Sequence, residues 1–346
     1  MNAHKQEGKG GTTRRGFLLG AAAAMIVPEP VRDESVNQCE LQTVLGRVRG
    51  AGIGRMLPHE HVMVDFIGAD KTGPHRWNRD EVFRVMKPHL DAARQAGVTC
   101  IAECTPMFLG RDILLLERLA RATKLHILTN TGLYKAPYLP AYAFEADADR
   151  LAARWIAEWQ NGIEGTSVKP GFIKIAVNPG KLEPVQRKIV QAAARTSRAT
   201  GLTIACHTGH GKAALECLEI LREESLPLDR FIFVHADAEP DQQTHLEVAR
   251  AGAWVEYDSI GWRPLPEHVR LITSFLRNGP ANCLLLSHDA GWYHVGEEGG
   301  GEIKPMTPLF KHLLPLLRRE GMTDQLLLQL TRDNPICAFA IRKSLP

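Results

Sequence analysis

The stretch "MLPHEHVMVDF", residues 56–66, places His59 and His61 two positions apart inside a largely apolar run. Such a run is typical of a buried β-strand, in which successive side chains point to opposite faces. His59 and His61 therefore share one face, and Glu60 lies on the other. Two imidazoles on one face predict half of a metal site, although a hydrogen-bonded pair of core histidines gives the same pattern.

Short β-rich runs alternate with longer amphipathic segments along the rest of the chain. We expect strands near residues 55–64, 98–104, 125–131, 171–177, 202–208, 231–236, 253–258 and 283–289. Eight strands that alternate with helices predict an α/β fold, a (β/α)8 TIM barrel. The alternative is a doubly wound open sheet, but no Gly-x-Gly-x-x-Gly turn follows an early strand.

Polar residues occupy strand positions that burial should exclude. Lys174 lies in the middle of the apolar run "GFIKIAV", "IACHTGHG" ends a strand in His207, "FIFVHADAE" ends one in His235, and "LLLSHDAGW" ends the last in Asp289. Each residue alone has an ordinary explanation, such as a turn cap or a lysine that reaches water. Active sites of such barrels lie at the C-terminal ends of the strands, so these residues together predict a polar site there.

Composition excludes several other classes of protein. The chain has 346 residues, 44% of them hydrophobic, and a formal net charge of +3. This is the composition of a soluble globular domain with a large core. The small excess of basic residues is not interleaved with aromatic ones, which argues against a nucleic-acid partner. The seven cysteines include no Cys-x-x-Cys pair, so we expect most of them to be buried apolar side chains.

The N-terminus predicts a targeting segment. In "TTRRGFLLGAAAAMIV", residues 12–27, Arg14 and Arg15 precede an apolar run, which resembles a twin-arginine export signal. We expect residues 1–35 to form the signal and linker and residues 40–346 to form the barrel. The processed protein would be periplasmic and not inserted in the membrane. A disordered basic tail on a cytoplasmic protein is the alternative.

Several motifs together resemble the phosphotriesterase family of the amidohydrolase superfamily, in its phosphotriesterase-related or lactonase-like branch. They are "LPHEHV", "GRD" (110–112), "TGLY" (131–134), "GFIKIA", "CHT", "VHAD", "SHDAGW" and "DNP" (333–335). The resemblance runs from about residue 42 to the C-terminus. It implies a binuclear metal centre in which carbon dioxide carbamylates the bridging lysine. The implied ligands are His59, His61 and Asp289 for a buried metal, His207 and His235 for a more exposed one, and Lys174 for both.

The resemblance also implies a chemistry. Neutral imidazoles and carboxylates suit zinc, with manganese, cobalt or iron as alternatives. Two such ions generate a bridging hydroxide that attacks an ester bond, and Asp289 would accept its proton. We expect a zinc-dependent hydrolase acting on a small carboxylic ester or lactone. Phosphotriester hydrolysis is the first alternative, and a metal-stabilised binding protein without turnover is the second.

Two features of the sequence differ from the pattern of many phosphotriesterases: the proton-relay positions and one interval between ligands. Some phosphotriesterases relay the proton from the aspartate through an Asp and a His, but those positions here are Ala238 and Ser259, with Asp237 and Asp258 beside them. The interval from His235 to Asp289 is short, as in the lactonase-like branch.

Aromatic residues on the predicted βα loops could wall a substrate pocket. These aromatic residues are Phe108, Tyr134, Trp262, Trp292 and Tyr293. A homodimer is a further possibility.

Overall fold

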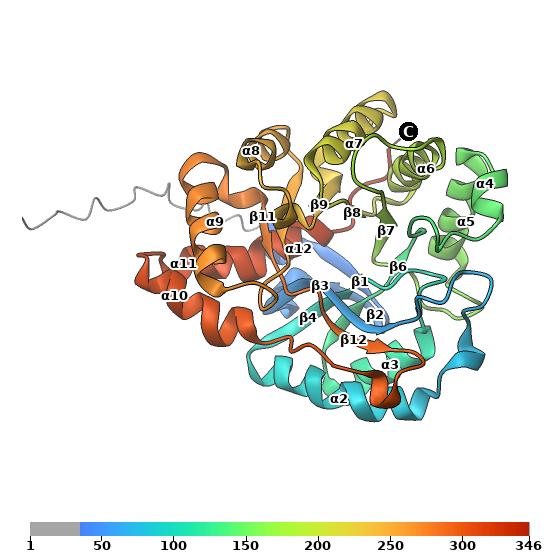
Figure 1. Ribbon diagram of the computed structural model, residues 1–346, viewed down its shortest axis with the longest axis horizontal. Coiled ribbons are helices and arrows are strands. Elements are labelled where there is room, and N and C mark those ends of the chain that lie inside the picture. Colours follow the sequence, from blue (N-terminus) through green and yellow to red (C-terminus); the bar gives the residue numbers. More distant parts are fainter. Residues whose placement is uncertain (1–34, 346) are drawn as a thin grey trace, which may run out of the picture.

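The computed structural model describes residues 35–345, in which helices surround a cylinder of parallel strands (Figure 1). The predicted export signal lies outside the described residues. The barrel wall consists of ten strand segments. They are β3 (Arg55–Val64), β4 (Val98–Glu103), β5 (His126–Leu128), β6 (Asn130–Thr131), β7 (Phe172–Ala176), β8 (Ile204–His207), β9 (Phe231–Val234), β10 (Trp254–Tyr257), β11 (Leu284–Leu286) and β12 (Ala290–His294).

Two of the barrel strands are interrupted. Only Thr129 separates β5 from β6, and residues 287–289 separate β11 from β12. The hydrogen-bonded orders are β12-β3-β4-β5 and β6-β7-β8-β9-β10-β11. Asp289 N donates to His59 O at 3.1 Å, and Ser287 N donates to Tyr257 O at 3.0 Å, so the last strand joins β3 to β10. With each interrupted pair counted as one strand, the structure is the predicted (β/α)8 barrel.

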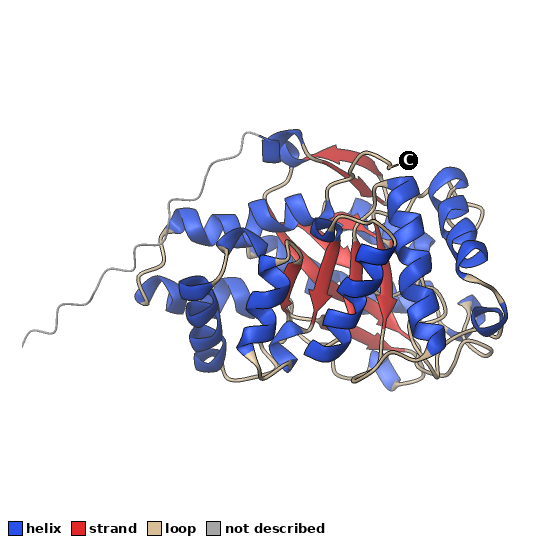
Figure 2. Ribbon diagram, turned by 90° about the horizontal axis from the view of Figure 1, so that it is seen from above, coloured by secondary structure: helices blue, strands red, loops and turns tan. Residues whose placement is uncertain are grey.

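Helices follow the strands and cover the outside of the barrel (Figure 2). Local signals fix their ends: Asn78 accepts hydrogen bonds from Asp80 N and Glu81 N at one start, and Gly201 ends another helix in the left-handed conformation. The covering helices are α2 (Arg79–Gln95), α3 (Ile113–Thr123), α5 (Ala148–Asn161), α6 (Pro184–Thr200), α7 (Gly211–Glu223), α8 (Gln242–Arg250), α9 (Leu265–Asn278) and α10 (Leu314–Arg319). Short helices complete the chain: α1 (Ser35–Gln38), α4 (Tyr142–Glu145), α11 (Asp324–Leu328) and α12 (Asn334–Phe339).

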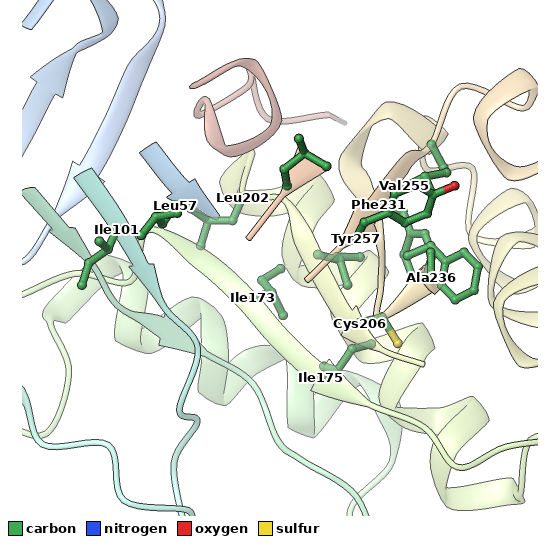
Figure 3. Packing of buried hydrophobic residues seen from close by; sticks show 14 of the residues in the cluster. Leu57, Ile101, Ile173, Ile175, Leu202, Cys206, Phe231, Ala236, Val255 and Tyr257 are labelled. Atoms are coloured by element: carbon green, nitrogen blue, oxygen red, sulfur yellow. The ribbon is translucent and has the colours of Figure 1, made fainter. Parts of the chain in front are cut away.

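Alternation along the strands divides the core into two layers. On β7, Ile173 and Ile175 pack outward with Val255 and Tyr257 of β10 in the layer beneath the helices (Figure 3). Phe172, on the other face of β7, packs inside the barrel. The inner layer is completed by Met56, Cys100, Ala102, Leu128, Ala205, Ile232, Val234, Trp254 and Leu285.

A hairpin and the C-terminal helix pack against this inner layer. The hairpin was not among the predicted strands. It consists of β1 (Glu40–Thr43) and β2 (Gly46–Arg49). Leu41 of β1 belongs to the inner cluster, and Phe339 of α12 meets Phe172 edge to face at 5.1 Å. The N-terminal ends of the strands are thereby covered, and polar residues are concentrated at the opposite ends. Within residues 35–345, no helix has the length and apolar character needed to cross a membrane.

Candidate metal centre

A β-bulge in β3 decides which face its two histidines occupy. Met56 packs inside the barrel and Leu57 outside it, so regular alternation would point His59 outward. The pairing with β4 shifts register between Leu57 and Glu60, and this extra residue turns His59 and His61 to the interior. Both are buried, and their Nε2 atoms lie 3.3 Å apart. The structure therefore confirms that the two imidazoles share one face.

Lys174 is buried beside these histidines and forms no direct ion pair within the described chain. It lies on the inward face of β7, is 1% exposed, and its Nζ is 3.2 Å from His59 Nε2. Among the described residues, no carboxylate forms an ion pair with it. An unpaired ammonium in a buried site is costly, because water no longer solvates it. A modification that removes the positive charge would remove this cost.

His207 and His235 meet on the next two strands. His207 ends β8 and His235 follows β9 with a left-handed backbone, at φ 60°. Their facing nitrogens, His207 Nδ1 and His235 Nε2, are 2.8 Å apart. His235 also lies close to His59, at 5.0 Å between ring centroids. The site therefore extends from β3 across to β9.

Asp289 completes the cluster from the gap between β11 and β12. Its backbone is left-handed, at φ 50°. Its Oδ1 lies 3.1 Å from His61 Nε2 and 3.5 Å from His59 Nε2, yet this buried oxygen has no hydrogen-bond partner in the described structure. The segment around Asp289 is held by Glu60, which accepts hydrogen bonds from Ser287 Oγ and Ala290 N. Asp289 thus places a carboxylate oxygen that accepts no hydrogen bond between two imidazoles.

A second layer of polar side chains fixes the orientation of these imidazoles. Asp258 lies 3.0 Å from His59 Nδ1 and 2.8 Å from His235 Nδ1, through different oxygens. Thr105 Oγ1 donates to a backbone carbonyl and is 2.8 Å from His61 Nδ1, so it accepts the Nδ1 hydrogen. The Nδ1 atoms of all three rings therefore carry the proton, and the Nε2 lone pairs point into the site.

Sequence reasoning named Asp258 only as a neighbour of a relay position, and it missed Glu256 and Thr105. Glu256 Oε1 lies 3.0 Å from His59 Nδ1. Glu256 and Asp258 are two residues apart in "VEYD", the spacing that singled out the two histidines of β3. That spacing could have placed both carboxylates inside the barrel.

Burial determines the charge of the cluster. It lowers the pKa of His59 to about 3, lowers that of His61, and holds the pKa of His207 well below its usual range. Burial also opposes protonation of His235, but Asp258 raises the pKa of this ring. Most of the imidazoles are therefore neutral near pH 7, which is the form that binds metal ions.

A cavity of about 490 Å³ opens above the cluster. His207, His235 and Asp289 line it, together with Trp262 and Trp292 from the predicted aromatic set. Tyr134 lies immediately beside it, with its hydroxyl 3.3 Å from His207 Nδ1. The remaining aromatic residues lie elsewhere: Phe108 contacts Tyr142, and Tyr293 donates to Glu81.

The two positions at which the sequence departs from the family's proton relay belong to the same cavity. Ala238 and Ser259 both line it. Ser259 Oγ donates to Asp237 Oδ2 at 2.5 Å, and Ser259 N donates to the same oxygen at 2.9 Å. Burial, reinforced by Asp258, raises the pKa of Asp237 to about 6. Asp237 thus sits next to the site in a hydrogen-bonded pair with Ser259.

The donor set fits divalent metal ions. His59, His61 and Asp289 offer three ligand atoms within 4.8 Å of one another. His59 and His235 also lie close to Asp258, but through the Nδ1 atoms that it orients. The orphaned Asp289 oxygen and the inward Nε2 lone pairs are acceptors that a cation would satisfy.

Comparison with known proteins agrees with this geometry. The model of the phosphotriesterase family matches residues 39–339. The aryldialkylphosphatase of Saccharolobus solfataricus is 29% identical over 300 residues, which cover 83% of this chain and 95% of that protein. The N-acetyltaurine hydrolase of Rattus norvegicus is 24% identical over 338 residues, covering 86% and 96%.

A solved structure gives the same result. A double mutant of the organophosphorus hydrolase from Deinococcus radiodurans superposes with a TM-score of 0.79 at 28% identity, and the match covers 87% of this chain and 97% of that one. Fold, barrel-end cluster and sequence match agree over nearly the whole described chain. The chain therefore belongs to the phosphotriesterase family.

Proposed function

We propose that this protein is a hydrolase that uses two divalent metal ions, preferably zinc, to cleave a carboxylic ester or lactone. The observation that carries the proposal is the set of inward lone pairs beside a buried lysine that forms no direct ion pair within the described chain. Once deprotonated, the Lys174 amine would add carbon dioxide and release a further proton, and the resulting carbamate is an anion able to bridge two cations. The ligands would be His59, His61, Lys174, His207, His235 and Asp289.

Two bound ions would supply an acidified water molecule and polarise the oxygen of the bond to be cut. The chain's own residues provide the rest. Asp289 would place its carboxylate where the nucleophile forms and could accept the proton there. Trp262 Nε1 donates to His288 O at 2.7 Å, which fixes its ring at the cavity wall. Asp258 holds the rings of His59 and His235 and so couples the two halves of the site.

The cavity favours a small substrate. Its volume of about 490 Å³ accommodates an ester or lactone of drug-like size or smaller. Phosphotriester hydrolysis is the alternative, supported by the similarity to an aryldialkylphosphatase. A metal-stabilised binding protein without turnover is the second alternative, and turnover of any compound by the metal-loaded protein would exclude it.

Hydrolysis of a defined panel tests the proposal. The purified protein, expressed with added zinc, is assayed on γ- and δ-lactones, phenyl esters and paraoxon. We expect kcat/KM for at least one lactone or phenyl ester to exceed that for paraoxon by about tenfold or more, which is about 1.4 kcal/mol of transition-state stabilisation. A higher value for paraoxon would select the phosphotriesterase alternative, and no turnover of any compound would select the binding protein.

We also propose that residues 1–35 direct twin-arginine export to the periplasm, with Arg14 and Arg15 as the recognition pair. A receptor reads this pair as a specific signal, so replacing both residues with Lys should retain the precursor in the cytoplasm despite the unchanged charge. Fractionation of cells that express the two forms measures the distribution. Equal export of both forms would contradict the proposal.

A further inference from the structure

Two cationic side chains line the cavity without a carboxylate to neutralise them. Lys135 lies on the loop after β6, and Arg263 lies on the loop between β10 and α9. In the part of the chain that the structure describes, neither forms an ion pair. Arg263 Nη1 donates to the backbone oxygen of Asp237 at 2.8 Å, which anchors the guanidinium and leaves its other donors available.

The carboxylates that line the same cavity interact with other side chains. Asp258 is bound by His59 and His235, Asp237 accepts two hydrogen bonds from Ser259, and Asp289 faces the imidazoles. Within the described chain, none of them forms an ion pair with Lys135 or Arg263. Lys135 and Arg263 therefore line the cavity without a direct ionic partner, so both are available to an anion that enters it.

Among the described residues, His207 is the polar side chain that contacts Lys135, and it would cease to be an acceptor for Lys135 if it bound a metal ion. Lys135 Nζ lies 2.8 Å from His207 Nε2, whereas His207 Nδ1 faces His235 and is the nitrogen directed at the metal site. A neutral imidazole that coordinates through Nδ1 carries its hydrogen on Nε2. That nitrogen could then no longer accept a hydrogen bond from an ammonium group. Lys135 would be left with donors and no acceptor beside a dication, an arrangement that Coulomb repulsion opposes.

An anion in the cavity resolves this conflict, because it accepts hydrogen bonds from Lys135 and balances the charge of Arg263. We infer that Lys135 and Arg263 form an anion-binding subsite, and that the substrate carries a carboxylate, sulfonate or phosphate group in addition to the bond that is cleaved. This inference rests on the proposed function and narrows it to anionic esters or lactones.

Two synthetic esters isolate the effect of the charge. Monophenyl adipate and phenyl 6-methylheptanoate share the phenoxide leaving group and chain length, and differ in a terminal carboxylate or isopropyl group. With the metal-loaded protein, we expect kcat/KM for the adipate to exceed that for the neutral ester by about 10- to 100-fold, the range for one charge-assisted hydrogen bond.

Substitutions of Lys135 and Arg263 test whether these residues cause the preference for the adipate ester. Lys135→Met should reduce the adipate preference by about tenfold or more, mainly through KM, because the subsite binds a part of the substrate remote from the reacting bond. Lys135→Arg should retain much of it, and Arg263→Gln should reduce it less than Lys135→Met does. Lys304→Met is the matched control: Lys304 lies 5.1 Å above the Trp262 ring, but it is paired with Glu302 at 2.7 Å. Lys304→Met should leave the preference for the adipate ester unchanged.

The outcomes separate this inference from the function on which it rests. Hydrolysis of both esters with similar kcat/KM, together with no effect of Lys135→Met on their ratio, would overturn the anion subsite and leave the hydrolase intact. Failure to hydrolyse either ester, or any lactone of the panel, would overturn the hydrolase and the subsite with it. A preference that Lys304→Met abolishes as strongly as Lys135→Met would also contradict the assignment.

Discussion

Replacing Lys174 with Ala should remove most of the bound metal and lower kcat by about 1,000-fold or more, equivalent to roughly 4 kcal/mol of barrier. The reason is the position of Lys174: it is buried, it contacts His59 Nε2 at 3.2 Å, and it forms no direct ion pair in the described chain. If its role is to supply a carbamate, the substitution removes an anion between two cations. Elemental analysis and ester turnover on the same preparation measure both effects.

Two further substitutions separate a carbamate from a structural lysine. Lys174→Glu keeps a carboxylate at shorter reach and should retain part of the metal and of the activity. Lys174→Met should raise the thermal midpoint of the metal-free protein, because it removes a buried, unpaired charge, but it should bind metal as poorly as the Ala variant. Lys212→Ala, at an exposed position in α7, is the control. A fully metallated, fully active Ala variant would refute the bridge.

Removing the metal ions should abolish activity and also destabilise the fold. The site holds His59, His61 and Asp289 close together, and without a cation the Asp289 oxygen is left without a partner. Chelation should reduce kcat/KM by more than about 1,000-fold, or roughly 4 kcal/mol. Because metal binds only the folded state, an excess of about 100 times Kd should add about 2.7 kcal/mol to the free energy of unfolding. Urea denaturation with and without added zinc measures this difference, and equal midpoints would contradict it.

The barrel could be predicted because each strand is a short apolar run between longer amphipathic segments. All eight predicted ranges overlap a strand. The ends of β5 and β11 were less predictable. Thr129 interrupts one strand, and the left-handed conformation of Asp289 interrupts another. Such breaks depend on hydrogen bonds with distant residues, such as those that Glu60 accepts from Ser287 and Ala290. Local sequence carries little information about contacts of that kind.

Sequence reasoning named the polar residues that the structure brings together, but not those that support them. His59, Lys174 and Asp289 stood out because burial excludes their side chains from ordinary strands. Glu256 followed the same rule but has no place in the implied ligand set, so only the structure showed it beside His59. The role of Lys135 depends on the nitrogen of His207 that it approaches, a detail of ring orientation that no sequence pattern encodes.

The most direct test of the central claim, a hydrolase that requires two metal ions, is a titration of the metal-free protein with zinc in bicarbonate buffer. Ester turnover and bound zinc are measured at each step on the same sample. We predict that activity rises until about two ions are bound per chain and then stays constant, as six ligands shared between two ions require. Full activity in the metal-free protein, or a plateau at one ion per chain, would contradict the binuclear centre.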